Sequence, residues 1–191
     1  MGILQPHARH NGRADEREVN PAQVTIRGIA LGDVASYRAC VGAVMRERKY
    51  LAYLEPFSFA ETAAFVAENI DKGNPHFVAD DAGRIVGWCD VRRESVPTYA
   101  HEGILGMGVL EEWRGRGLGA RLIRATLDAT KGAGFERISL TVYESNVRAA
   151  ALYRKFGFIH EGTRVRGRKV DGAYDDVHEM ALFVEQETPQ R

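Results

Sequence analysis

The sequence predicts a mixed α/β fold in which helices flank one central, largely antiparallel sheet. Short runs that alternate apolar and polar residues, typical of strands, change several times along the chain to segments with apolar residues at helical spacing. Turn signals at Asp81-Ala82-Gly83 and Asp171-Gly172 favour hairpins, which join antiparallel strands. We therefore expect about six to seven strands and about four helices.

The N-terminal part is predicted to contain one strand and two helices. Val24–Ile29 alternates apolar residues with polar neighbours, as a strand does. Asp33 and Ser58 each precede a segment whose apolar residues fall on one helical face, so each is expected to cap a helix.

Three strands and a long helix follow. The expected hairpin pairs His76–Asp80 with Arg84–Arg93, and the next strand is Glu102–Leu110. A glycine-rich turn then opens a helix that runs from Leu118 to about Lys131.

The C-terminal part is predicted to hold the last helix and three strands. Phe135–Tyr143 has the apolar character of a buried strand, and Gly157 closes a short helix at Asn146–Phe156. Phe158–Arg168 and Val177–Val184 are expected to form the final hairpin.

One domain is expected at residues 23–186, because 191 residues match the size of a single domain and no linker or repeat divides them. Residues 1–22 carry many charges and few large apolar side chains, so we expect a mobile N-terminal tail. Residues 187–191 are expected to be a similar tail.

The composition excludes several classes of protein. The chain has 26 basic and 26 acidic residues, so it lacks the overall positive charge that favours nucleic acid or anionic membranes. Cys40 and Cys89 are too few for a disulfide framework, and the histidines lack metal-binding spacing. No apolar run reaches the roughly 18 residues of a spanning helix, and residues 1–20 lack a secretory apolar core, so a cytoplasmic protein is expected.

A basic run at Arg164, Arg166, Arg168 and Lys169 leaves RNA association as a weaker alternative. The arginines recur at every second residue, as they would on the exposed face of a strand, and no aromatic residue lies between them. A solvated hairpin is therefore the favoured interpretation.

The segment from Arg114 to Ala120 is the strongest chemical signal, because it joins a strand to a helix through Gly115, Gly117 and Gly119. Glycines let backbone N–H groups approach a ligand closely, and the start of a helix adds unpaired N–H groups that favour phosphate. Arg114 and Arg116 can add charge-assisted hydrogen bonds. A P-loop is excluded because no Gly-Lys precedes a Ser or Thr here, and Ala120 fits only the permissive form of a dinucleotide fingerprint.

These residues resemble those of the GNAT superfamily of N-acyltransferases. Arg114-x-x-Gly117-x-Gly119 is similar to the pyrophosphate motif of that family. The stretch from Asn146 through Ala-x-x-Leu-Tyr to Gly157-Phe158 is similar to its second signature. The resemblance implies a GNAT-like fold, acetyl-CoA as cosubstrate, no metal, and a binding set of Met107, Val109, Arg114, Gly115, Arg116, Gly117, Gly119, Ala120 and Asn146.

Within that resemblance, Asn146 and Tyr153 are expected to face one ligand, since seven residues span almost two helical turns. Asn146 would hydrogen-bond the pantetheine arm and Tyr153 would protonate the leaving thiolate, although Tyr153 can also be explained by packing. The dense glycines in Glu102–Leu110 predict a bulge or an open edge, or alternatively packing under a bulky side chain such as Trp113.

The general base is the least determined part of the expected site. Related enzymes often carry a carboxylate at the position that Ile104 occupies here. Glu102 lies two residues earlier on the same strand face and is the predicted base, with His101 as the neighbouring alternative. Both residues can equally be explained as solvated loop residues.

The resemblance implies transfer of an acetyl group to a primary amine of a small molecule or a peptide terminus, by direct attack in a ternary complex. Acceptor residues are expected near Arg46–Phe57 and Ser95–Ala100, where Tyr50, Tyr53 and Phe57 either line a pocket or pack in the core. A non-catalytic acyl-CoA-binding module is the alternative function. A homodimer is possible through exposed sheet edges.

Overall fold

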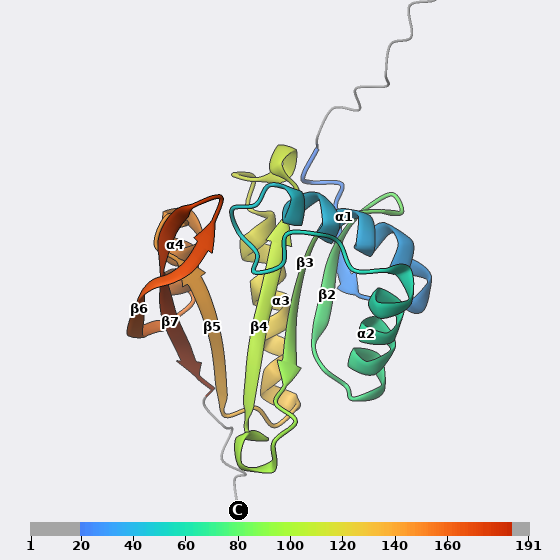
Figure 1. The fold of residues 1–191 in the computed structure, drawn as a ribbon. Helices are drawn as coiled ribbons and strands as arrows, with labels where there is room; N and C mark the ends of the chain where they lie inside the picture. Colours follow the sequence, from blue (N-terminus) through green and yellow to red (C-terminus); the bar gives the residue numbers. More distant parts are fainter. Residues whose placement is uncertain (1–19, 185–191) are drawn as a thin grey trace, which may run out of the picture.

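The computed structural model describes residues 20–184, which form seven strands in one mixed sheet (Figure 1). The strand order is β1-β2-β3-β4-β5-β7-β6. All neighbours are antiparallel except β4 and β5. The strands are β1 (Thr25–Gly28), β2 (His76–Asp81), β3 (Arg84–Arg93), β4 (Glu102–Val109), β5 (Arg137–Tyr143), β6 (Ile159–Val170) and β7 (Ala173–Phe183). The predicted fold class is confirmed. Residues 1–19 and 185–191, which include most of the predicted N-terminal tail and all of the predicted C-terminal tail, lie outside the described part.

Four helices cover the two faces of the sheet (Figure 1). The helices α1 (Val34–Arg46) and α2 (Phe59–Asp71) lie on one face, and α3 (Leu118–Gly132) lies on the other. The helix α4 (Val147–Lys155) lies beside the start of α3, where Leu152 would touch a side chain placed at Gly119. No helix between residues 20 and 184 is long and apolar enough to span a membrane.

The predicted helix caps differ in how they are realised. Ser58 forms a capping box with Glu61: the Glu61 N–H donates to Ser58 Oγ at 3.2 Å, and the Ser58 N–H donates to Glu61 Oε2 at 2.8 Å. Asp33 occupies the N-cap position of α1 but makes no side-chain cap bond. Its carboxylate instead accepts from the Ala30 N–H at 2.8 Å and pairs with Arg27, because a 3₁₀ turn precedes the helix.

Both cysteines are buried and unpaired, as expected from the sequence. The final hairpin is longer than predicted. Asp171 and Gly172 both have positive φ, at 51° and 82°, and a two-residue turn of this kind lets both strands run up to it.

The basic run in that hairpin contacts other side chains of this chain. Arg164 pairs with Glu179 at 3.1 Å, and Arg166 and Lys169 lie over the ring of Tyr174 at 5.3 and 4.9 Å. These contacts agree with the interpretation of the basic run as part of a hairpin surface.

The strand β4 has an open edge over most of its length. It pairs with β5 only through Glu102, Gly103 and Ile104, after which the two strands separate. Beyond that point β4 stays paired with β3 up to Val109, and β5 stays paired with β7 up to Tyr143. The open edge predicted from the glycines is therefore confirmed, and the β3–β4 register shows no bulge.

Two of the glycines in β4 are required by packing. A Cβ at Gly108 would lie 2.3 Å from the Trp88 ring, and a Cβ at Gly103 would lie 2.4 Å from Val91 and 2.8 Å from Phe135. The bulky neighbours are thus Trp88 and Phe135, and not the Trp113 named as the alternative. The absence of a side chain at these two positions lets Trp88, Val91 and Phe135 pack directly against the backbone of β4.

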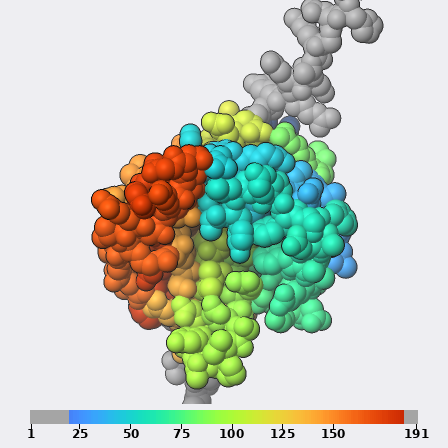
Figure 2. Space-filling view, in the orientation of Figure 1, coloured from blue at the N-terminus to red at the C-terminus, as the bar shows by residue number. Residues whose placement is uncertain are grey.

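The segment after α1 reaches across the open edge to the β6–β7 hairpin. Arg48 Nη2 pairs with Asp171 Oδ1 at 2.7 Å, and Arg168 Nη2 donates to the Arg48 carbonyl at 2.7 Å. Figure 2 shows this cyan segment against the red hairpin, with a hollow between them, α2 and the green-yellow β4 region.

We predict that Gly108→Ala destabilises the fold by about 1–3 kcal/mol, because its methyl group would overlap the buried Trp88 ring. Gly28→Ala is the matched control in a strand, since nothing lies within 4 Å of the added Cβ. Urea unfolding of both variants measures the difference. Equal free energies of unfolding would contradict the packing role of Gly108.

Candidate functional site

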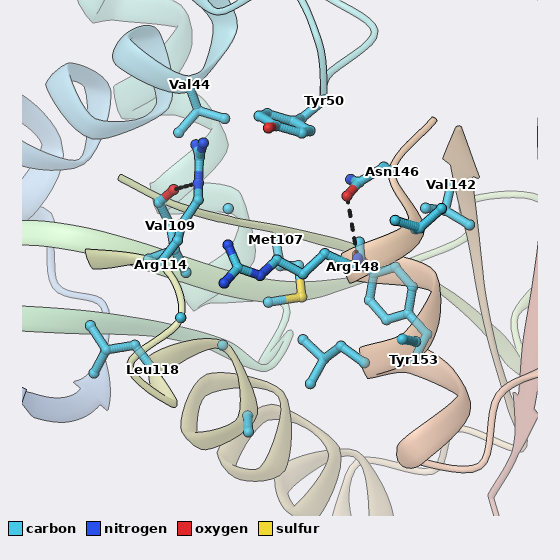
Figure 3. Close-up of a pocket in the computed structure, with 18 of the residues that line it drawn as sticks. Val44, Tyr50, Met107, Val109, Arg114, Leu118, Val142, Asn146, Arg148 and Tyr153 are labelled. Atoms are coloured by element: carbon cyan, nitrogen blue, oxygen red, sulfur yellow. Dashed lines mark hydrogen bonds between the residues drawn. The ribbon is translucent and has the colours of Figure 1, made fainter. Parts of the chain in front are cut away.

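Two cavities border β4 where its edge is open. The first, about 540 Å³, is bounded by β4, β5, the start of α3 and α4, with Val44 and Tyr50 from α1 and the segment after it (Figure 3). The second, about 510 Å³, lies between the sheet and the α1–α2 segment. Met107 lines both cavities. A ligand in one cavity can therefore meet a ligand in the other at this residue.

In β4, the backbone N–H and C=O groups of the odd-numbered residues point toward the open edge. The Leu110 N–H donates to the Val86 carbonyl, and the Glu94 N–H donates to the Glu102 carbonyl, so even-numbered residues of β4 bond to β3. The open edge beside the first cavity therefore carries the N–H and C=O of Met107 and the N–H of Val109. This is the orientation that the predicted main-chain contacts require.

The turn before α3 forms a cradle of backbone donors. Gly115 and Gly117 have φ of 75° and 83°, which is left-handed backbone that favours glycine. Gly117 is the N-cap of α3 and offers no side-chain cap. The first helical bond runs from the Arg121 N–H to the Gly117 carbonyl at 3.2 Å, so the three preceding amides have no partner among the described residues. A diphosphate fits these donors.

All predicted binding residues except one line the first cavity. Arg116 is the exception, and its Nε donates to the Glu112 carbonyl at 3.1 Å. The residues that do line it are Met107, Val109, Arg114, Gly115, Gly117, Gly119, Ala120 and Asn146.

Arg114 is held by the protein itself. Its Nη1 pairs with Glu47 Oε2 at 2.7 Å, its Nε donates to the Val109 carbonyl at 2.8 Å, and its guanidinium lies 4.7 Å from the Tyr50 ring centre. These contacts fix the turn against the end of α1. They leave Arg114 less free to bind a phosphate than the sequence suggested.

Arg148 is a cation at this cavity that the sequence analysis missed. Figure 3 shows its side chain extending from α4 toward the turn. Its Nη2 lies 2.8 Å from the position of a Cβ at Gly115, and no hydrogen-bond partner is described for it. Helical spacing could have identified it. Arg148 precedes Leu152 by four residues, so both lie on the face of α4 that is directed toward α3.

Asn146 and Tyr153 both line the first cavity from α4. Asn146 Oδ1 accepts from the Ala149 N–H at 3.2 Å, which caps the helix and leaves the side-chain amide as a donor (Figure 3). The Tyr153 ring lies 5.8 Å from that of Phe158, and burial raises the pKa of its hydroxyl well above the usual value. Tyr153 is thus a neutral proton donor at physiological pH.

Glu102 lies away from both cavities. Its Oε1 accepts from Arg137 Nε at 3.1 Å at the paired end of β4, and neither Glu102 nor His101 lines a cavity. Ile104 does line the second cavity. The structure therefore does not bring the predicted base to the site, because its carboxylate is tied to β5 where the strands are still paired.

The second cavity combines aromatic side chains with four charged ones. Tyr53 and Phe57 contribute to it as expected, whereas Tyr50 lines the first cavity and no residue of Ser95–Ala100 lines either. Its charged side chains are Arg38, Glu61, Asp90 and Arg92.

Asp90 is the buried acid of this cavity and was missed by the sequence analysis. It is 6% exposed, and burial raises the pKa of its carboxyl to about 7, with Arg92 acting in the opposite direction. The signal that was available is an aspartate inside the otherwise apolar run of β3.

Residues 20–184 contain no group of three histidine, cysteine or acidic side chains that can hold an ion.

Known proteins resemble this chain in sequence and fold. The model of the acetyltransferase (GNAT) family matches residues 43–158. The N-alpha-acetyltransferase RimI of Mycobacterium tuberculosis is 36% identical over 112 residues, covering 58% of this chain and 68% of that protein. The L-amino acid N-acetyltransferase AaaT of Escherichia coli is 31% identical over 110 residues, covering 57% and 68%.

A solved structure of YncA from Salmonella typhimurium, a putative acetyltransferase with its cofactor acetyl-CoA, has a TM-score of 0.81 at 16% identity. The match covers 88% of this chain and 98% of that chain, and at this identity it shows the shared fold. Because the family model covers more than half of the chain and the fold agrees with it, this protein belongs to the GNAT family of acetyltransferases and is an N-acetyltransferase.

Proposed function

We propose that this protein transfers an acetyl group from acetyl-CoA to a primary amine by direct attack in a ternary complex. The observation that carries the proposal is the pair of cavities that share Met107 across the open edge of β4. One cavity is rich in backbone donors and cations, and the other is aromatic with a buried acid. A transferase that joins an anionic thioester donor to an amine needs these two sites side by side.

The donor is held by backbone and cationic groups. The amides of Leu118, Gly119 and Ala120 and the guanidinium of Arg148 bind the diphosphate. The backbone groups of Met107 and Val109 pair with the pantetheine arm as an added strand would, and the Asn146 amide donates to it. The thioester then lies near Tyr153 at the open edge.

The chemical step forms a C–N bond and breaks a C–S bond. The amine attacks the thioester carbonyl, the intermediate expels the thiolate, and the Tyr153 hydroxyl protonates the sulfur. Cys40 and Cys89 line neither cavity, so no thiol of this chain is placed to carry the acetyl group. Direct transfer is therefore favoured over a covalent enzyme intermediate.

The acceptor is a single primary amine on an apolar body. Of the two acids in the second cavity, Glu61 already caps α2, which leaves Asp90 for one ammonium group. A polyamine would need several unpaired carboxylates. The names of two relatives, an N-alpha-acetyltransferase and an L-amino acid N-acetyltransferase, also favour a small or terminal amine.

We predict that Tyr153→Phe lowers kcat about a hundredfold or more, because the variant cannot protonate the departing sulfur. Its affinity for coenzyme A is expected to stay within about twofold of the wild type, since the ring is kept. Thiol release from acetyl-CoA with a panel of amino acids, their amides and dipeptides measures the rate. Binding of coenzyme A without turnover of any amine would contradict an enzyme and favour the acyl-CoA-binding module.

We predict that Arg148→Ala weakens binding of coenzyme A about tenfold or more, through loss of a charge-assisted contact to the diphosphate. Arg154→Ala is the matched control, because Arg154 is an exposed cation of α4 that lines neither cavity. Calorimetry with coenzyme A and with pantetheine, which lacks the diphosphate, separates the contributions. Equal losses for both ligands would refute the phosphate role.

A further inference from the structure

Asp90 lies at the centre of a row of residues that crosses three strands. His76 of β2 is its register partner on one side, and Gly106 of β4 is its partner on the other. Residues directly opposite each other in antiparallel strands share one face of the sheet. This row therefore places the Asp90 carboxylate beside the backbone of β4 that borders both cavities.

The glycine at position 106 keeps this carboxylate accessible from the open part of β4. A Cβ at Gly106 would lie 3.4 Å from Asp90 Oδ1, so any longer side chain there would cover the acid. Gly106 lines the second cavity together with Asp90 and Met107. The acid is thus within the lining that meets the donor cavity.

The charged and titratable groups around Asp90 leave it unpaired. They are Tyr37 and Arg38 of α1, Glu61 of α2, His76 of β2, and Cys89 and Arg92 of β3. No hydrogen bond or ion pair of Asp90 is described with any of them in residues 20–184. Burial lowers the pKa of His76 to about 4, so its ring is neutral and does not neutralise the acid.

Two of these neighbours have contacts elsewhere. Arg38 Nε donates to the Phe57 carbonyl at 2.6 Å, and His76 Nδ1 lies 3.3 Å from Asn69 Nδ2, while His76 Nε2 is buried with no hydrogen-bond partner among the described residues. Burying an ionised acid without a partner lowers the stability of the fold. A cation bound beside Asp90 would reduce this cost.

We propose that Asp90 binds the ammonium group of the acceptor and removes its proton. The inference rests on the proposed function and assigns the base of that same site to β3 in place of Glu102. An ammonium in the second cavity gives one proton to Asp90 Oδ, and the neutral amine then attacks the thioester. As the intermediate collapses, the Tyr153 hydroxyl gives its proton to the departing sulfur. The nitrogen then loses its second proton to the Tyr153 oxygen, which restores the hydroxyl. The products are an amide, a free thiol and one proton, which leaves Asp90 for solvent.

The ionisation of Asp90 suits this role. Burial raises the pKa of its carboxyl from the ordinary value of 3.8 to about 7, with Arg92 opposing the shift. An acid in this range accepts a proton more readily than a surface carboxylate and still ionises near neutral pH.

The same shift predicts how stability depends on pH. The folded state holds the Asp90 proton more tightly than the unfolded state, so this residue lowers stability as pH rises from about 4 to about 7. The Tm of Asp90→Asn relative to the wild type is therefore expected to rise over that range and then level off. A difference in Tm that is independent of pH would overturn the assignment of Asp90 as a base that ionises near neutrality.

The test of the proposal is the pH profile of kcat/KM for Asp90→Asn with the best acceptor of the amine panel. Without the base, the variant must bind the neutral amine, whose fraction grows tenfold per pH unit below the amine pKa. We expect a loss of about a hundredfold or more at pH 7 that shrinks steadily toward pH 9. Binding of coenzyme A by calorimetry is expected to be unchanged.

Two variants control for charge and for folding. Glu68→Gln removes an exposed acid of α2 that lines neither cavity, so its profile is expected to match the wild type. Asp90→Glu keeps a carboxylate and is expected to keep the wild-type shape of the profile at a lower rate, which also tests the base if Asp90→Asn does not fold.

The outcomes separate this inference from the proposed function. If the wild type acetylates an amine but Asp90→Asn loses little activity, or loses the same factor at every pH, the role of Asp90 as base is refuted and the transferase assignment stands. An Asp90→Glu profile without the wild-type shape would also refute it. If the wild type acetylates no amine of the panel, the proposed function fails and the inference fails with it.

Discussion

The short pairing between β4 and β5 is the constraint on which the rest of the site depends. Three residue pairs hold the two strands together, and each strand then follows its other neighbour. The N–H and C=O of Met107 and the N–H of Val109 are left at an edge inside the sheet, where they need partners from outside the chain, whereas the Val109 carbonyl already accepts from Arg114. A ligand with an extended amide chain satisfies these groups in the way that a strand would.

The electrostatic character of the two cavities differs in the way that their proposed ligands differ. The charged side chains of the first cavity are Arg114, Arg148 and Lys155, all basic, and the uncapped start of α3 adds to their field. The second cavity has two acidic side chains, Glu61 and Asp90, and two basic ones, Arg38 and Arg92, and Asp90 is the buried acid among them. The first cavity therefore favours an anionic donor, and Asp90 offers a site for one ammonium group in the second cavity, with Met107 between them.

Local signals in the sequence predicted most of the fold. The capping box at Ser58, the Asp81-Ala82-Gly83 hairpin and the glycine turn before α3 each depend on residues close together in the chain. The open edge of β4 was also foreseen from its glycines, although two of those glycines are explained by Trp88 and Phe135.

The contacts that the sequence did not predict join distant segments. Glu102 is tied to Arg137, Arg114 is tied to Glu47, and Arg148 reaches Gly115 only because α4 lies beside the turn. Asp90 became a candidate only when the register placed it opposite Gly106 and next to the second cavity. Pairing partners and burial of a single charge are set by tertiary structure, which periodicity in one sequence does not contain.

The central claim is that the open edge of β4 and the first turn of α3 bind the acyl donor. Amide hydrogen exchange with and without coenzyme A tests it directly, residue by residue. The account predicts slower exchange at Met107, Val109 and the three amides at 118–120, with little change at Ile104, whose backbone already bonds to β3. Binding of coenzyme A with unchanged exchange at these amides, or with protection confined to another surface, would contradict it.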